Sequence, residues 1–157
     1  MKLNSISLKR SDQLTEKWVQ DQIADDPSIL GLGDLVLRDK ERIQSSAGRL
    51  DLLLQDPDTL KRYEVEIQLG ATDESHIIRT IEYWDIERKR YPQYEHAAVI
   101  VAEEITSRFL NVIQLFNGAI PLIMRLHMDW SMKMSLSQSL RTERFGNQHG
   151  VQIKLSL

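Results

Sequence analysis

Two runs of residues with a period of two, 48–55 and 60–69, flank the sequence Asp-Pro-Asp-Thr at positions 56–59. Apolar and polar side chains alternate in both runs, which is the pattern of half-buried β-strands. Pro57 is favoured at the second position of a β-turn, and Asp56 is favoured at the first. Residues 48–69 are therefore predicted to form a β-hairpin, the central element of the chain.

A turn centred on Pro57 and Asp58 predicts the register of this hairpin. It pairs Leu52 with Tyr63, and it places Asp51 opposite Glu64. Side chains alternate across a strand, so one face collects the apolar residues Leu50, Leu52, Leu54, Tyr63, Val65 and Ile67. The opposite face collects Arg49, Asp51, Leu53, Glu64, Glu66 and Gln68. Three carboxylates are therefore expected on one patch of the sheet.

Clustered carboxylates repel one another unless water screens them, protons neutralise them or a cation lies among them. One interpretation is a solvated hairpin face whose acidic residues keep the protein in solution. The other is a divalent-metal site with hard oxygen ligands, which suits Mg²⁺ or Mn²⁺. The spacing of the residues alone leaves both interpretations open.

The hydrophobic pattern outside the hairpin predicts three helices and further strands. The helices are expected from Ser11 or Asp12 to about Asp26, from Asp73 or Ser75 to about Arg90, and from Thr106 or Ser107 to Asn117. The strands are expected over residues 34–44, 97–102 and from Leu122 onward. This order predicts an α/β fold with a mixed central sheet flanked by helices on both faces.

Alternating apolar residues continue beyond position 129 to the end of the sequence. They predict a C-terminal β extension over about 130–157, appended to a core of about 11–128 within a single domain, 1–157. An apolar strand exposed at a sheet edge is a pairing surface. We therefore expect these strands to extend the sheet or to form a homodimer with a second copy.

Composition narrows the class of protein without identifying a function. The 157 residues suffice for one domain, and the 41% hydrophobic and 27% charged residues are ordinary for a globular protein. The absence of Cys excludes a disulfide scaffold, a thiolate zinc site and cysteine catalysis. No apolar run is long enough for a membrane span or a signal peptide, and a cytoplasmic location is expected. The net charge of −3 argues against broad adhesion to nucleic acid, although local basic clusters remain compatible with it.

The sequences Gly48-Arg49-Leu50-Asp51-Leu52-Leu53 and Glu66-Ile67-Gln68-Leu69-Gly70 resemble the core of the PD-(D/E)XK nuclease superfamily, which is restriction-endonuclease-like. That core has an Asp on one strand and an acidic-X-Lys triplet on the next. The resemblance makes Asp51, Glu66 and Gln68 the catalytic residues. It also implies metal binding by Asp51, Glu66 and the carbonyl of Ile67. Gln68 departs from the usual Lys and removes a cation that would help to orient and deprotonate the attacking water.

Two helices carry further candidate residues. The stretch around Glu16 resembles the first helix of the superfamily, which often supplies a Glu, so Glu16 and Glu64 are candidates to complete the acidic cluster. The position of Glu16 is also that of an ordinary acidic residue in a first helical turn, where the helix dipole favours it. His76, Arg79 and Tyr83 lie along one edge of the second predicted helix. Such side chains can bind phosphate, or they can simply lie at the boundary of the core.

The leading hypothesis is a nuclease, either endo or exo, that depends on Mg²⁺ or Mn²⁺ and hydrolyses phosphodiester bonds in nucleic acid, DNA in particular. The alternative is a noncatalytic nuclease-like module that binds nucleic acid or a protein partner, which Gln68 and the lack of a strongly basic surface favour. A plain assembly domain is a third interpretation. Binding of Mn²⁺ at the hairpin separates the enzyme from the assembly domain.

Overall fold

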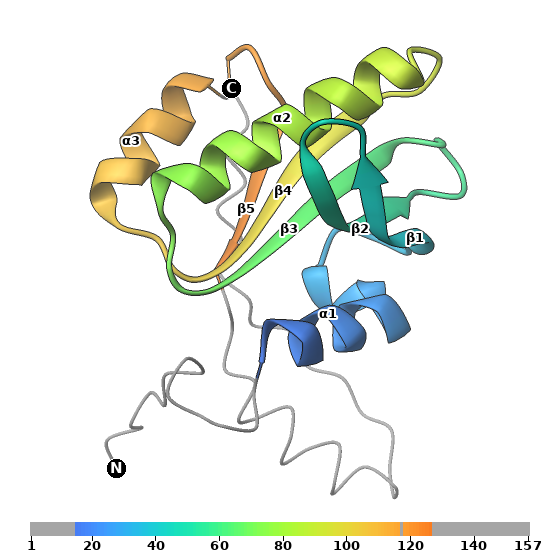
Figure 1. Cartoon of the computed structure of the whole chain (residues 1–157). Coiled ribbons are helices and arrows are strands. Elements are labelled where there is room, and N and C mark those ends of the chain that lie inside the picture. Colours follow the sequence, from blue (N-terminus) through green and yellow to red (C-terminus); the bar gives the residue numbers. More distant parts are fainter. Residues whose placement is uncertain (1–14, 117, 127–157) are drawn as a thin grey trace, which may run out of the picture.

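The computed structural model describes residues 15–116 and 118–126, which form a five-stranded sheet with helices on both sides (Figure 1). In chain order the elements are α1 (Glu16–Asp25), the short 3₁₀ helix η2 (Pro27–Leu30), β1 (Val36–Gln44), β2 (Gly48–Gln55), β3 (Arg62–Ala71), α2 (Glu74–Arg90), β4 (His96–Glu104), α3 (Ser107–Phe116) and β5 (Leu122–Leu126). The α/β fold with a mixed central sheet is confirmed. The predicted C-terminal extension and its homodimer lie outside the described residues.

The strands lie in the sheet in the order in which they occur in the sequence, β1-β2-β3-β4-β5. The pairs β1–β2 and β2–β3 are antiparallel, whereas β3, β4 and β5 are parallel to one another. The two parallel connections pass through α2 and α3, as parallel strands require a crossover. In the view of Figure 1, α2 and α3 lie above the sheet and α1 lies below it.

Side-chain alternation along β3 and β4 separates two hydrophobic cores. Val65 and Val99 face α1, where they pack with Val19 and Ile23. Ala98 and Ile100 face the other side, with Trp84 of α2 and Phe109 of α3. Glu64, Glu66 and Gln68 alternate with the α1-facing residues, so they lie on the α2 side of the sheet.

Two helix starts are fixed by side-chain caps. Asp73 accepts a hydrogen bond from the backbone nitrogen of His76 and caps α2, as predicted. The helix α1 begins at Glu16, because the Thr15 hydroxyl accepts from the backbone nitrogen of Trp18. The prediction of a cap at Ser11 or Asp12 is therefore wrong.

The hairpin β2–β3 forms, but its register differs from the prediction by two residues. Leu52 pairs with Val65, and Leu53 lies opposite Glu64, the place predicted for Asp51. The loop is longer than a two-residue turn because the Asp56 side chain accepts from the backbone nitrogens of Asp58 and Thr59. A shift of two residues keeps the side chains of the paired residues on their predicted faces.

The turn between β1 and β2 bends over α2, as Figure 1 shows. Arg42 and Gln44 both donate to Oε1 of the buried Glu87, at 2.9 and 2.8 Å. Leu50, predicted to share a face with Leu52, packs instead with Leu53 and Tyr83. The pairing of β2 with β3 ends at Leu52, so the preceding residues of β2 follow β1 toward the helix.

No helix in the described ranges is both long and apolar enough to cross a membrane.

Candidate active site

The strands β2 and β3 stop pairing in the middle of the hairpin, and the two carboxylates of the motif lie at this fork. The ladder runs from Gln55↔Arg62 to Leu52↔Val65 and goes no further. Asp51 is the next residue of β2 and Glu66 the next of β3. The structure therefore brings Asp51 and Glu66 together on the α2 side of the sheet, as the alternation predicted.

Asp51 and Glu66 are joined by hydrogen bonds that replace the missing ladder. The backbone nitrogen of Asp51 donates to Glu66 Oε1 at 3.1 Å. The backbone nitrogen of Ile67 donates to Asp51 Oδ2 at 2.8 Å. Each carboxylate thus accepts one hydrogen bond from the backbone of the partner strand, through one of its two oxygens. This arrangement fixes both side chains and leaves the second oxygen of each available.

Burial shifts the protonation of both acids. Burial raises the pKa of Asp51 to about 6, although the hydrogen bond from Ile67 opposes this change. Burial raises the pKa of Glu66 to about 8, and the negative charge of Asp51 raises it further. At neutral pH the pair therefore favours a state in which the two carboxylates share one proton. A bound cation would favour the doubly ionised form.

Two arginines contribute positive charge at the fork. Arg79 of α2 is exposed, and its charge opposes the upward pKa shifts of both Asp51 and Glu66. Arg49, the second residue of β2, has the same effect on the pKa of Asp51. Their guanidinium groups place positive charge near the acid pair, as a phosphate-binding site requires.

Beyond the fork, further carboxylates bind the backbone of β3. Glu16 Oε1 accepts from the nitrogen of Leu69 at 3.1 Å, and Glu103 Oε2 accepts from the nitrogen of Gly70 at 2.8 Å. The charge of Glu16 also raises the pKa of Asp51 and of Glu66. The structure thus brings Glu16 toward the acid pair, as predicted from its position in the first helix.

Gln68 is engaged with the start of α2 instead of with the acid pair. Its amide nitrogen donates to Asp73 Oδ2 at 3.1 Å, and its amide oxygen accepts from the Asp73 nitrogen at 3.2 Å. The side chain is largely buried, with 8% of its surface exposed. These two bonds orient the residue that caps α2. Gln68 retains one amide N–H for another acceptor.

Glu64 lies on the predicted face but belongs to a different cluster. Its Oε1 lies 2.7 Å from His96 Nδ1, and both side chains are fully buried. The other ring nitrogen of His96 lies 3.0 Å from the Tyr91 carbonyl oxygen. Burial raises the pKa of Glu64, and the bond with His96 opposes this change. This pairing separates Glu64 from the fork.

Of the three residues predicted to bind substrate, Tyr83 is enclosed and the other two lie at the start of α2. The Tyr83 hydroxyl donates to the Ala47 carbonyl and accepts from the Arg49 nitrogen, both at 3.0 Å. Tyr83 thereby holds the β1–β2 turn against the helix. His76 is half-buried, with Nδ1 3.5 Å from Asp73 Oδ1. His76 and Arg79 are one helical turn apart and share one side of α2.

The described residues contain no group of three or more His, Asp or Glu side chains arranged to hold a metal ion. Asp51 Oδ1 and Glu66 Oε2 nevertheless accept no hydrogen bond within this part of the chain, and neither is a fully enclosed polar atom. Mg²⁺ commonly binds one or two protein carboxylates and completes its shell with water. The two free carboxylate oxygens at the fork are ligands that fit an ion of that kind.

Sequence reasoning missed several residues at the fork and in the neighbouring cluster of Glu64. Gln20 of α1 is buried and donates to the Asp51 carbonyl oxygen at 3.0 Å, and Glu103 and His96 lie on β4. Gln20 follows Glu16 by four residues, a spacing that places both on one side of a helix. That spacing could have identified Gln20 as a further candidate residue beside Glu16. Glu103 and His96 make contacts more than 30 residues away in sequence, which no local pattern reveals.

No protein-family model matches the chain, and a search of curated proteins found no match. Two solved structures share its fold. A repair endonuclease from Pyrococcus abyssi has a TM-score of 0.59 and 18% identity over 72% of this chain and 46% of that chain. The EndoMS–dsDNA2 complex has a TM-score of 0.57 and 16% identity over 80% of this chain and 47% of that chain. This chain therefore spans less than half of either protein, and at these identities the likeness is one of fold.

Proposed function

We propose that this chain is a metal-dependent nuclease of the PD-(D/E)XK type that hydrolyses phosphodiester bonds in DNA. The meeting of Asp51 and Glu66 at the fork between β2 and β3 carries the proposal. These are the two acids that the sequence motif assigns to the superfamily's site. They also lie beside cationic side chains, as cleavage of a phosphate backbone requires.

The free oxygens of Asp51 and Glu66, with the carbonyl of Ile67, would hold Mg²⁺ or Mn²⁺. When bound, such an ion polarises a phosphate oxygen and lowers the pKa of a coordinated water. Glu16 is the candidate third acid, since its charge acts on both carboxylates. Glu64 is left out of this set because His96 occupies one of its oxygens.

The remaining groups position the substrate. Arg79 and His76, one turn apart on α2, would bind backbone phosphate next to the acid pair. Gln68 keeps one amide N–H that can hold a water, but it brings no positive charge to that water. We assign Gln68 chiefly a positioning role, because its two bonds to Asp73 fix the start of the helix that carries Arg79.

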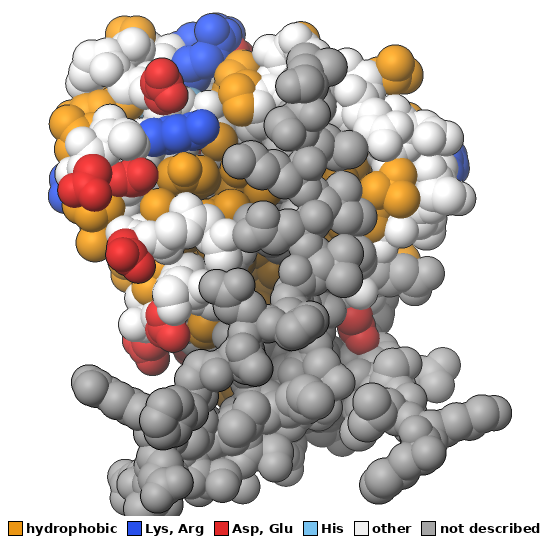
Figure 2. All heavy atoms as spheres, turned by 180° about the vertical axis from the view of Figure 1, so that it is seen from behind, with side chains coloured by type: hydrophobic (Ala, Val, Ile, Leu, Met, Phe, Trp, Pro, Cys, Tyr) orange, Lys and Arg blue, Asp and Glu red, His pale blue; other side chains and the backbone are white. Residues whose placement is uncertain are grey.

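Two observations support DNA as the substrate. One of the similar folds is a repair endonuclease, and the other was determined with double-stranded DNA. The face seen in Figure 2 presents few Lys and Arg side chains among its described residues, interspersed with Asp and Glu. Backbone binding needs concentrated positive charge. We place DNA on the side of the sheet that carries α2, because the charge of Arg79 on that helix acts on both carboxylates.

A noncatalytic DNA-binding module is the second candidate function. Both polar ends of Gln68 are taken up by Asp73, where an active site would use this position for catalysis. The described residues also lack a third acidic or imidazole ligand in place for metal. A module of this kind would bind DNA through Arg79 and its neighbours without cutting it.

The test is cleavage of single-stranded, double-stranded and mismatched DNA by the full chain with Mg²⁺ or Mn²⁺. We expect cleavage by the wild-type chain and its loss in Asp51→Asn and Glu66→Gln, because each substitution keeps shape while removing one ligand charge. Glu82→Gln is the matched control, since Glu82 is an exposed carboxylate on α2.

Cleavage by the wild-type chain that persists in Asp51→Asn would refute the assignment of the site. If no DNA form is cut with either metal, yet all variants bind DNA equally, the noncatalytic module is the correct function.

A further inference from the structure

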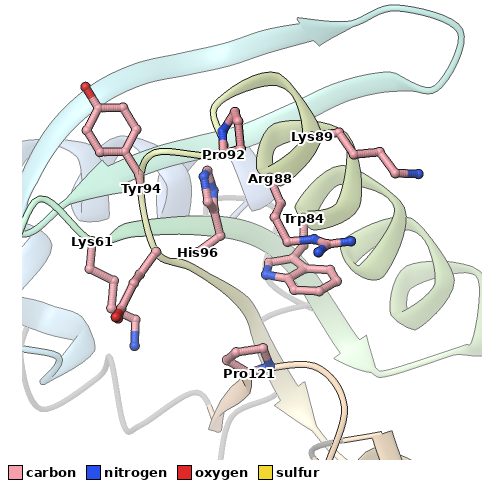
Figure 3. A pocket seen from close by; sticks show the side chains of 9 residues that line it. Lys61, Trp84, Arg88, Lys89, Pro92, Tyr94, His96 and Pro121 are labelled. Carbon is pink, nitrogen blue, oxygen red and sulfur yellow. The ribbon is translucent and has the colours of Figure 1, made fainter.

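A pocket of about 500 Å³ lies between the C-terminal end of α2 and the loops that precede β3, β4 and β5 (Figure 3). Its volume is in the range of small-molecule sites. Its walls include Lys61, Trp84, Arg88, Tyr94 and Pro121. The acid pair plays no part in this pocket. From Arg79 to Arg88 the helix advances about 13 Å.

The buried indole nitrogen of Trp84 lacks an acceptor. Trp84 is 8% exposed, and its Nε1 is enclosed without a hydrogen-bond partner in the described ranges. Figure 3 shows this nitrogen directed into the space between His96 and Pro121. A buried N–H without a partner costs free energy. A ligand that offers an oxygen acceptor here would remove that cost.

Three cationic side chains line the same pocket. The Arg88 guanidinium lies 4.8 Å from the centre of the Trp84 ring, and only its Nη2 is bound to Asp85, at 2.9 Å. Lys61 also lines the pocket, and its ammonium lies 5.6 Å from the centre of the Tyr63 ring. Lys89 also lines the pocket but is bound to Asp85. One acid, Glu95, stands against these three cations in the wall.

The remaining lining contains three rings besides Glu95 and His96. Tyr94, Pro92 and Pro121 also line the pocket. The guanidinium of Arg62 is stacked on Tyr94, 4.1 Å from the ring centre, which fixes the orientation of that ring. Rigid aromatic and proline surfaces suit the planar ring of a base.

We propose that this pocket binds a nucleotide, with its phosphate held by Arg88, Lys61 and the Trp84 N–H and its base against Tyr94 and the two prolines. The phosphate supplies the acceptor that Trp84 lacks and the charge that matches the guanidinium fork. The nucleotide is either free or the end of a nucleic-acid strand. The inference is independent of the proposed nuclease, since none of its residues belongs to the fork.

The experiment follows the indole N–H resonances of the full chain by ¹H–¹⁵N correlation NMR. The chain has three Trp residues, and Trp84→Phe assigns the relevant signal. The probes are inorganic phosphate, dAMP and a short 5′-phosphorylated oligonucleotide, each at constant ionic strength. We expect a saturable shift of the Trp84 signal with dAMP. Lys61→Gln and Arg88→Gln should each weaken binding by about threefold to tenfold.

Lys17→Gln is the matched control, because it removes an exposed cation on α1, far along the chain from the pocket. A shift with the oligonucleotide but not with dAMP would support the proposal and assign the pocket to a strand end. The proposal fails if none of the three probes moves the Trp84 signal, or if chloride moves it equally. It also fails if Lys17→Gln weakens binding as much as Lys61→Gln does.

Discussion

The substitution Glu66→Gln should stabilise the metal-free protein at alkaline pH. Glu66 has a pKa of about 8 in the folded chain against an ordinary value of 4.5, chiefly because of burial. One pKa unit corresponds to about 1.4 kcal/mol, so ionising Glu66 costs the folded state up to about 5 kcal/mol. Gln carries no charge and can still accept the hydrogen bond from the Asp51 nitrogen through its amide oxygen.

The direction of the pH dependence follows from the number of protons that the folded and unfolded chains bind. Between pH 4.5 and about 8 the folded chain keeps a proton that the unfolded chain has released. The free energy of unfolding of the wild type therefore decreases as the pH rises through this interval and levels off above it. The pKa of Asp51 is raised from 3.8 to about 6. Asp51 therefore makes the free energy of unfolding decrease further between these two pH values. Glu66→Gln should remove the part of this decrease in the free energy of unfolding that extends to about pH 8.

The assay is urea unfolding with EDTA present. We expect equal stability of the wild type and Glu66→Gln near pH 5, and an advantage of about 2–5 kcal/mol for the variant near pH 9. Glu82→Gln, at an exposed position on the same side of the sheet, should follow the wild type at both pH values. Equal pH dependence of the wild type and Glu66→Gln would refute the claim that Glu66 is buried against a second carboxylate.

The other predictions concern the two contacts that frame the fork. Gly48→Ala should destabilise the fold by more than about 1 kcal/mol, because Gly48 has a φ of +107° and a Cβ would lie 2.7 Å from the Tyr83 hydroxyl oxygen. Thermal unfolding of Gly48→Ala in a Tyr83→Phe background should show a smaller loss, and strict additivity would contradict the contact. Gln68→Lys should retain or increase DNA cleavage, because Lys restores the superfamily's usual cation. It should also lower the free energy of unfolding by about 1 kcal/mol, since Lys cannot accept from the Asp73 nitrogen. Loss of cleavage in a folded Gln68→Lys protein would contradict this assignment.

The sequence predicted which side chains share a face of the sheet, but it did not predict the register of the hairpin. Alternation along β2 and β3 placed Asp51, Glu66 and Gln68 on one side, and any even shift preserves that result. The register depended on the loop, where the Asp56 side chain binds two backbone nitrogens and Leu60 adopts a φ of +63°. Positive φ is uncommon for Leu, so the turn residues gave no warning of this longer loop.

The sequence predicted which residues of the candidate site lie on one face of the sheet, but not the partners that they contact. Periodicity placed three carboxylates on one face, and the resemblance to the superfamily singled out Asp51 and Glu66. Neither could show that Gln68 is bound to Asp73 or Glu64 to His96. Both partners are set by tertiary packing of β3 against α2 and β4. The fork itself, where Asp51 and Glu66 replace ladder bonds, also depends on the β1–β2 turn being held by Tyr83.

Calorimetric titration of the full chain with Mn²⁺ near pH 7, in two buffers that differ in ionisation enthalpy, tests the central claim most directly. If Asp51 and Glu66 form the metal site, the wild type binds Mn²⁺ and releases about one proton per ion, because Glu66 must ionise to become a ligand. Asp51→Asn and Glu66→Gln should both lose this binding, while Glu82→Gln should keep it. The absence of Mn²⁺ binding by the wild type, or binding that Asp51→Asn leaves unchanged, would contradict the account.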